Sequence, residues 1–134
     1  RGDITIINDA YNANPRSMEE ALMTLSSYKT SGKKVFVMGG MLELGRISES
    51  AHKNFGKQFS DSSVDLLVTV GTLAQLASHT ALDSGVDENR VRSFENKEDS
   101  ILFLNESLQV GDCILVKGSR GMRMEQVIEG ISKK

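Results

Sequence analysis

The sequence predicts an α/β domain in which helices cover both faces of a mainly parallel sheet of about five or six strands. Short β-branched runs alternate along the whole chain with segments of helical spacing, which gives a βαβα rhythm. The runs are continuously apolar, as in strands that are buried on both faces. With 134 residues, of which 39% are hydrophobic, the chain fits one domain spanning residues 1–134 and has no room for a second.

Five runs are expected to form the strands. Each is rich in β-branched and apolar residues, and the intervals between them can hold crossover helices. In chain order the expected strands are residues 4–7, 35–38, 66–70, 91–94 and 114–116.

Apolar residues that recur every three or four positions predict five helices between and after these strands. The expected apolar stripes are Met18, Ala21, Leu22 and Leu25 in a helix ending near Gly32; Ile47, Ala51, Phe55 and Phe59; Leu73, Leu76 and Ala77; Ile101, Leu104 and Leu108; and Met124, Val127, Ile128 and Ile131. Thr72 and Asn96 are expected to cap the third and fourth helices, because their short polar side chains can accept from free amides of the first turn. The resulting order is that of a doubly wound, Rossmann-like fold.

Composition excludes several classes of partner. The formal net charge is −2 and the isoelectric point is about 5.7, so a broad attraction to nucleic acid or to an anionic membrane is not expected. Cys113 is the single cysteine and cannot form an internal disulfide, and no signal peptide or bilayer-spanning run is visible. We therefore expect a cytoplasmic protein.

The junction after the first strand, NDAYNANPRS, carries an unusual number of hydrogen-bonding side chains. Asn14 can cap the next helix with Pro15 at its first position, while Ser17 and Glu20 offer a competing capping box. Asp9, Tyr11 and Asn12 precede the cap. Such residues bind ribose and base in nucleotide-binding α/β folds, but a polar turn that satisfies its own backbone explains them equally well.

The junction after the last strand, VKGSRGMRME, gathers Lys117, Arg120 and Arg123 within seven residues. Glycines that allow close backbone approach and the start of the next helix make it a candidate anion site. A solvated basic loop, with Arg123 paired to Glu125 or to another acid, is the other interpretation. The segment is not a P-loop, because no glycine stands five residues before a Gly-Lys-Ser/Thr triplet.

The middle junction, MGGMLELGR, offers Glu43 as its one acid before Gly45. Packing of this loop explains its leucines, and a catalytic or metal-binding role for Glu43 is the less favoured alternative. His52 and His79 lack acidic or cysteine neighbours at metal-ligand spacing, so both are expected to be surface or half-buried side chains, and no metal site is predicted.

Three segments together resemble the C-terminal domain of the Mur ligase family. They are NDAYNANPRSMEEAL at residues 8–22, VMGGMLELGRISESAHKNFG at residues 37–56 and ILVKGSRGMRME at residues 114–125. The similarity runs from about Ile4 to Ile128, and YNANP combined with KGSRGMRME is highly specific. Sister ligases typically have histidine before the Asn-Pro pair, so Asn12 and Asn14 favour the member that adds D-alanyl-D-alanine to UDP-N-acetylmuramoyl-tripeptide.

The resemblance implies a role within a larger, ATP-dependent ligase. Family members have three domains, and the central one carries the P-loop, Mg²⁺ and most phosphate contacts. The chain starts at Arg1, just before the first expected strand, so we expect a part of such an enzyme that is inactive alone and monomeric. A different Mur or folylpolyglutamate-type ligase, or a non-catalytic nucleotide-binding module, are the alternatives.

The resemblance also assigns roles to the residues of the two junctions. Asp9 matches the position that contacts the nucleotide, while Tyr11, Asn12 and Asn14 would line the nucleotide and the domain interface. Lys117, Ser119 and Arg120 match the loop that faces the incoming dipeptide and its carboxylate; none of the seven is expected to be catalytic. Family members often have Asp where this chain has Gly40. Because carboxyl ends of parallel strands share one sheet edge, Asp9 and Arg120 should lie at the same edge.

Overall fold

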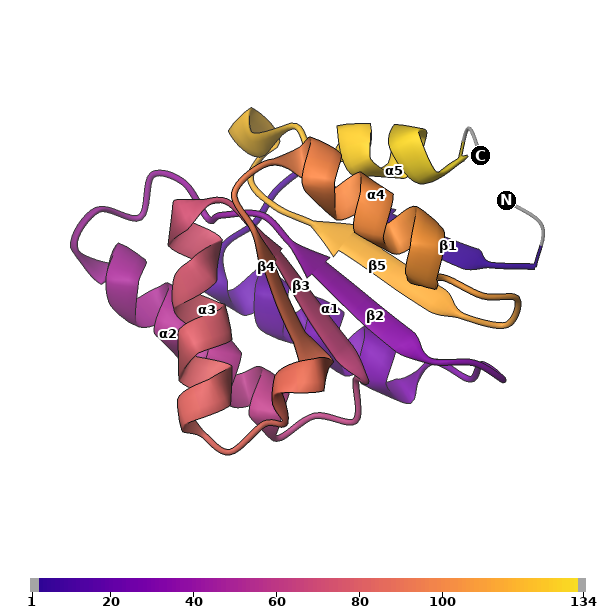
Figure 1. Ribbon diagram of the computed structural model, residues 1–134. Helices are drawn as coiled ribbons and strands as arrows, with labels where there is room; N and C mark the ends of the chain where they lie inside the picture. Colours follow the sequence, from indigo (N-terminus) through magenta and orange to yellow (C-terminus); the bar gives the residue numbers. More distant parts are fainter. Residues whose placement is uncertain (1–2, 133–134) are drawn as a thin grey trace.

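A five-stranded, fully parallel sheet forms the centre of the computed structural model, which describes residues 3–132 (Figure 1). The strand order is β1-β5-β2-β3-β4, so the last strand in sequence lies between the first two. The strands are β1 (Thr5–Asp9), β2 (Lys34–Met38), β3 (Leu66–Val70), β4 (Val91–Phe94) and β5 (Cys113–Lys117). The predicted α/β class and parallel sheet are confirmed.

Helices cover both faces of the sheet, as expected for a doubly wound fold (Figure 1). On one face lie α1 (Pro15–Ser27), α2 (Ser48–Ser60) and α3 (Thr72–Asp83), and on the other lie α4 (Lys97–Ser107) and α5 (Glu125–Ser132). Three short 3₁₀ turns, η1 (Gly45–Ile47), η2 (Glu88–Arg90) and η3 (Arg120–Met122), complete the chain. The connections from β1 to β2, β3 and β4 run in one direction across the sheet, and the connection from β4 to β5 runs back. Because such crossovers are right-handed, this reversal places α4 on the opposite face from α1, α2 and α3.

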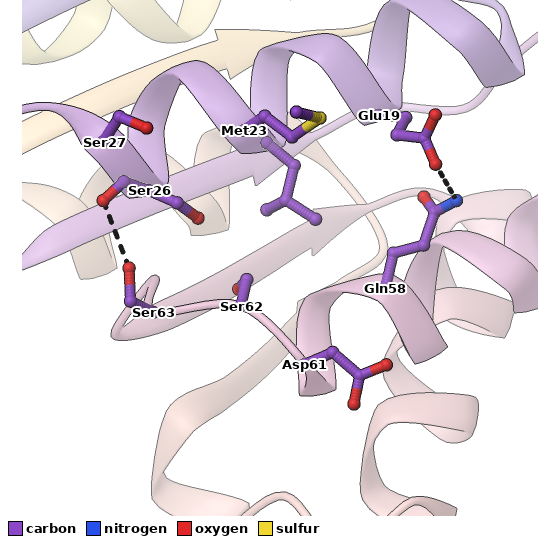
Figure 2. A pocket seen from close by; sticks show the side chains of 9 residues that line it. Glu19, Met23, Ser26, Ser27, Gln58, Asp61, Ser62 and Ser63 are labelled. Atoms are coloured by element: carbon purple, nitrogen blue, oxygen red, sulfur yellow. Dashed lines mark hydrogen bonds between the residues drawn. The ribbon is translucent and has the colours of Figure 1, made fainter.

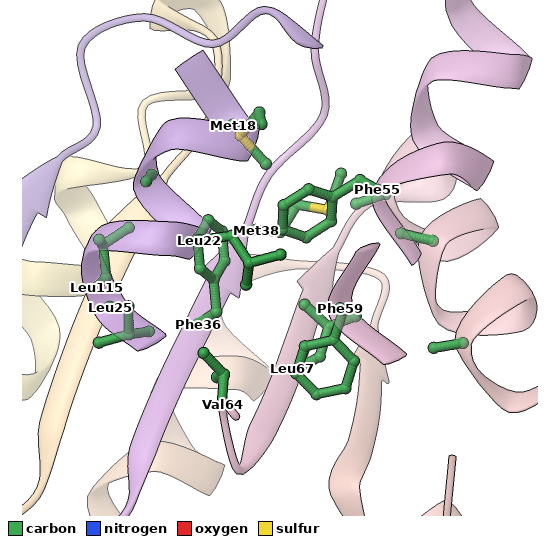
Figure 3. Packing of buried hydrophobic residues seen from close by; sticks show 14 of the residues in the cluster. Met18, Leu22, Leu25, Phe36, Met38, Phe55, Phe59, Val64, Leu67 and Leu115 are labelled. Atoms are coloured by element: carbon green, nitrogen blue, oxygen red, sulfur yellow. The ribbon is translucent and has the colours of Figure 1, made fainter. Parts of the chain in front are cut away.

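Alternate side chains of each strand feed two separate apolar cores, because successive strand residues point to opposite faces. In β2, Phe36 and Met38 face the α1–α3 side, whereas Val35 and Val37 face α4 and α5. Figure 3 shows the first core, where the ring centroids of Phe36 and Phe55 lie 5.0 Å apart. Burial on both sides explains why these strands show no alternation in the sequence.

The face that α3 buries differs from the prediction. Its buried residues are Ala74, Ala77, Ser78 and Ala81, while the expected Leu73 and Leu76 are only half-buried. Close packing against α2 is the reason: a Cβ added to Gly56 would lie 2.2 Å from the backbone oxygen of Ala77. Small side chains occupy the contact because there is no space for larger ones.

Helix starts follow the expected chemistry in two of three cases. Asn14 and Asn96 cap α1 and α4, accepting from the amides of Ser17 and Asp99 at 2.8 Å each. Ser17 completes the capping box with Asn14, so the alternative box with Glu20 does not form. Three expectations were wrong: Gly71 occupies the cap position assigned to Thr72, Ile47 lies exposed in η1 before α2 begins, and Met124 lies just before α5.

The amino end of the sheet is closed by a lysine–aspartate pair. Asp112 accepts from Lys33 Nζ at 2.5 Å and from the backbone amides of Lys33 and Gln109 at 2.9 Å each. Burial raises the pKa of this carboxyl, but the hydrogen bonds from Lys33 and Gln109 outweigh it, and the net pKa is below the ordinary value of 3.8. The charged carboxylate is therefore the form that the fold selects.

Between residues 3 and 132 the chain has no helix with the length and hydropathy needed to cross a bilayer.

Candidate functional site

The strand order creates two crevices, one on each side of β5. The loops after β1 and β2 lead to helices on one face, whereas the loop after β5 leads to α5 on the other. In open α/β sheets, ligands bind where neighbouring loops diverge in this way at the carboxyl ends of strands. The three junctions singled out in the sequence meet at this edge.

Asp9 and Lys117 end neighbouring strands and lie opposite each other in the sheet register. Lys117 Nζ donates to Asp9 Oδ2 and to the backbone oxygen of Asn12, both at 2.9 Å. The lysine side chain is only 3% exposed, whereas that of Asp9 is 43% exposed. The Lys117 ammonium group therefore makes its contacts within the protein, whereas the Asp9 carboxylate is accessible to a ligand.

Arg120 and Tyr11 stack on one another above the same pair of strands. Arg120 Cζ lies 4.7 Å from the centroid of the Tyr11 ring, a cation–π contact between the loops after β5 and β1. The Tyr11 side chain is 70% exposed. This contact confirms that Asp9 and Arg120 lie at the same edge of the sheet, as expected.

The loop after β2 is fastened to the loop after β5 by backbone hydrogen bonds. Gly39 N donates to the oxygen of Lys117 at 2.8 Å, and Ser119 N donates to the oxygen of Gly40 at 3.0 Å. The amide of Leu42 donates to Ser119 Oγ at 2.7 Å. Ser119 is buried, so its hydroxyl supports the neighbouring loop.

Two cavities flank Arg120, which lines both. One, of about 420 Å³, is lined by Asn8, Ala10, Tyr11, Arg120 and Glu125. The other, of about 500 Å³, is lined by Asn12, Ala13, Leu42, Glu43, Ser119, Arg120, Gly121 and Arg123. A guanidinium shared by two adjacent cavities can hold a negatively charged group in either of them.

Glu43 and Arg123 contribute opposite charges to the second cavity. They are also the two non-glycine residues with left-handed backbone among residues 3–132, with φ of 64° and 54°. Such backbone costs about 1–3 kcal/mol and is concentrated at functional sites. Arg123 is exposed, and the described part of the chain shows no ion pair between it and Glu125 or another acid.

A third groove of about 520 Å³ lies between α1 and α2, away from the strand ends (Figure 2). Two hydrogen bonds link polar groups of its walls: Gln58 donates to Glu19 at 3.0 Å, and Ser63 Oγ donates to the backbone oxygen of Ser26 at 3.2 Å. It contains no cationic side chain. The cavities around Arg120 are therefore the better candidates for an anionic ligand.

The cysteine and the two histidines are the remaining side chains of a reactive type. Cys113 is buried, and burial raises the pKa of its thiol despite the nearby Lys34. His79 is exposed, but His52 is fully buried and was wrongly expected to be at most half-buried. In the part of the chain that the structure describes, no group of three or more histidine, cysteine or acidic side chains is arranged to hold a metal ion.

The chain belongs to the Mur ligase family. Its residues 1–120 match the family described as "Mur ligase, glutamate ligase domain". The fold and the clustered junctions are those that the resemblance implied.

Particular relatives narrow the comparison. The UDP-N-acetylmuramoyl-tripeptide–D-alanyl-D-alanine ligase of Bacillus subtilis is 38% identical over 96% of this chain. MurF from Acinetobacter baumannii superposes with a TM-score of 0.89 at 30% identity, over the whole chain and 29% of that structure. MurF from Thermotoga maritima, solved with ADP, superposes with a TM-score of 0.80 at 25% identity, over 98% of the chain and 28% of that structure. The chain spans 28% of the length of the Bacillus ligase.

The structure brings together all seven residues that the sequence proposed for ligand binding, but it gives them different positions. Tyr11, Asn12 and Arg120 are exposed and line the cavities. The carboxamide oxygen of Asn14 is taken by the helix cap. Lys117 and Ser119 are buried and make internal contacts, although Ser119 also lines the second cavity.

Proposed function

We propose that this chain is the C-terminal domain of an ATP-dependent ligase that adds D-alanyl-D-alanine to UDP-N-acetylmuramoyl-tripeptide in peptidoglycan precursor synthesis. The observation that supports the proposal most is the meeting of Asp9, Tyr11 and Arg120 at one sheet edge, within a chain whose relatives carry that name. The ligase would act in the cytoplasm as a monomer. Alone, the chain would be inactive, because the P-loop and the Mg²⁺ site belong to the central domain.

Asp9 fits a nucleotide. Its carboxylate is partly exposed at the end of β1, where an acidic side chain can accept from ribose hydroxyls. Tyr11 and Asn12 lie beside it with side chains suited to stacking and to hydrogen bonding. Asn14 would contribute only its amide nitrogen, because its oxygen caps α1.

The cavity between the loops fits a small dipeptide. Arg120 is the exposed cation of its wall that the resemblance assigns to the dipeptide carboxylate, and guanidinium binds carboxylate through two parallel hydrogen bonds. Lys117 and Ser119 have a supporting role. The lysine holds Asp9 and the loop after β1, and the serine holds the loop after β2.

The role proposed for these residues is placement. In the family reaction, ATP phosphorylates the terminal carboxylate of the tripeptide, and the dipeptide amine attacks that acyl phosphate to give the amide and phosphate. A dipeptide fixed by its carboxylate presents its amine in a defined direction, and good orientation lowers such a barrier by several kcal/mol, up to about 7–11. None of the residues described here forms a covalent bond with substrate in this scheme.

Arg120→Ala in the full-length ligase is the direct test. Loss of a charge-assisted hydrogen bond costs about 1.5–3 kcal/mol, so kcat/KM for D-alanyl-D-alanine should fall about 10- to 150-fold. The KM for the UDP-tripeptide should change less than about threefold, because that substrate makes no contact with this loop in the scheme.

Arg92→Ala is the matched control. Arg92 lies on β4, at the opposite edge of the sheet from β1, and also stacks on an aromatic ring: its Cζ is 5.1 Å from the centroid of Phe103. This substitution should leave both substrates unaffected. Equal losses for the two substrates with Arg120→Ala would contradict the assignment, and consumption of a different amine acceptor would favour another ligase of the family.

A further inference from the structure

His52 has a buried position that the proposed reaction does not use. It lies on α2 with no exposed surface, and its Nε2 accepts from the amide of Met41 at 2.9 Å. Its Nδ1 lies 2.6 Å from the backbone oxygen of Ser48. A backbone amide can only donate and a backbone carbonyl can only accept, so these partners assign the proton to Nδ1 and the lone pair to Nε2.

The segment that His52 holds forms part of the second cavity. Met41 is buried in the core, while its neighbours Leu42 and Glu43 line the cavity. The amides of Met41 and Leu42 are consecutive and are taken by different elements: His52 from α2 and Ser119 from the loop after β5. These two bonds fix the backbone from both sides just before the left-handed turn at Glu43.

We infer that His52 is a positioning residue: its hydrogen bond to the Met41 amide fixes the backbone of the segment that forms one wall of the proposed dipeptide cavity. Its kinetic consequence rests on the proposed function, whereas its effect on the loop does not. The ring lies close to the backbone before Met41, since a Cβ added to Gly40 would be 3.8 Å from His52 Nε2 and 3.4 Å from Leu73 Cβ.

The alternative is a histidine that merely fills the core. Two substitutions separate the roles, because each keeps one of the two ring positions. Glutamine at 52 can present an amide oxygen near the place of Nε2 and keep the bond to Met41. Asparagine can present an amide nitrogen near the place of Nδ1 and keep only the bond to Ser48.

Amide hydrogen exchange in the 134-residue chain tests the loop directly. His52→Asn should speed exchange of the Met41 amide at least about tenfold, whereas His52→Gln should stay within about threefold of the original chain. His79→Asn on the exposed side of α3 is the matched control and should change nothing at Met41. Equal exchange in the Asn and Gln variants would overturn the inference.

Kinetics of the full-length ligase test the consequence. His52→Asn should raise the KM for D-alanyl-D-alanine about 3- to 10-fold with little change for the UDP-tripeptide, and His52→Gln should restore it. If Arg120→Ala impairs dipeptide use and His52→Asn does not, the inference fails and the proposed function stands. If neither does, the proposed site fails, and amide exchange alone decides the role of His52.

Discussion

Two lysine–aspartate pairs lie at opposite ends of the sheet, and they differ in which member is buried. At the amino end, the Asp112 side chain is 4% exposed and its partner Lys33 is 32% exposed. At the carboxyl end, the lysine is the buried member, and Asp9 carries the exposed surface. The same two residue types therefore build two different features.

The number of donors around each carboxylate explains the difference. Asp112 receives the Lys33 ammonium and two backbone amides, which leaves it little capacity for further partners. For Asp9, the structure shows one partner, Lys117. A saturated, buried pair stabilises the fold, whereas the buried Lys117 ammonium fixes the position of an exposed carboxylate, the one that we propose contacts the nucleotide.

Replacing the aspartate at the amino end of the sheet should cause the largest loss of stability. Asp112→Asn should lower the free energy of unfolding by about 2–4 kcal/mol, because it leaves the Lys33 ammonium and a backbone amide poorly paired. Asp9→Asn, the matched change, should cost less, about 1–2 kcal/mol: the buried Lys117 ammonium loses its counter-charge but keeps the backbone oxygen of Asn12 as an acceptor. Urea unfolding of the chain measures both, and equal losses would contradict the distinction.

A smaller difference is expected when the lysines are changed. Lys33→Met should cost about 2–3 kcal/mol because a buried carboxylate loses its counter-charge. Lys117→Met should cost about 1–2 kcal/mol, because Asp9 can turn to solvent and only the Asn12 carbonyl loses a buried donor. Thermal unfolding of the two variants orders them, and a greater loss for Lys117→Met would reverse the account.

The smallest effect concerns pH. The pKa of Asp112 is lower in the folded chain than its ordinary value of 3.8, so its stabilisation is complete above that value and is lost as pH falls through the folded pKa. The stability gap between the original chain and Asp112→Asn should therefore narrow progressively from about pH 4 downward. Denaturant titrations at several acidic pH values measure the gap; one that is constant or widens toward acid would count against the lowered pKa.

Local chemistry made much of the fold predictable. The five strands were located to within two residues at each end, because burial on both faces produces uninterrupted β-branched runs. The Asn14 and Asn96 caps followed from side chains that reach amides three residues away. The predicted buried face of α3 was right for Ala77 but wrong for Leu73 and Leu76, because Gly56 on α2 decides how closely the two helices approach.

The candidate site was predictable as a set of loops but not as a set of contacts. Loop positions follow from strand direction, so the neighbourhood of Asp9 and Arg120 could be foreseen. The bond from Lys117 to Asn12 spans 105 residues and that from Leu42 to Ser119 spans 77, and no spacing in the sequence encodes such partners. For the same reason, His52 gave no signal beyond its helical position.

The sharpest test is a crystal structure of the proposed full-length ligase in its closed form with ADP and D-alanyl-D-alanine. We expect the dipeptide carboxylate within hydrogen-bond distance of the Arg120 guanidinium and a ribose hydroxyl within hydrogen-bond distance of Asp9. A dipeptide bound away from the loop after β5, with Arg120 still stacked on Tyr11 and facing solvent, would contradict this expectation.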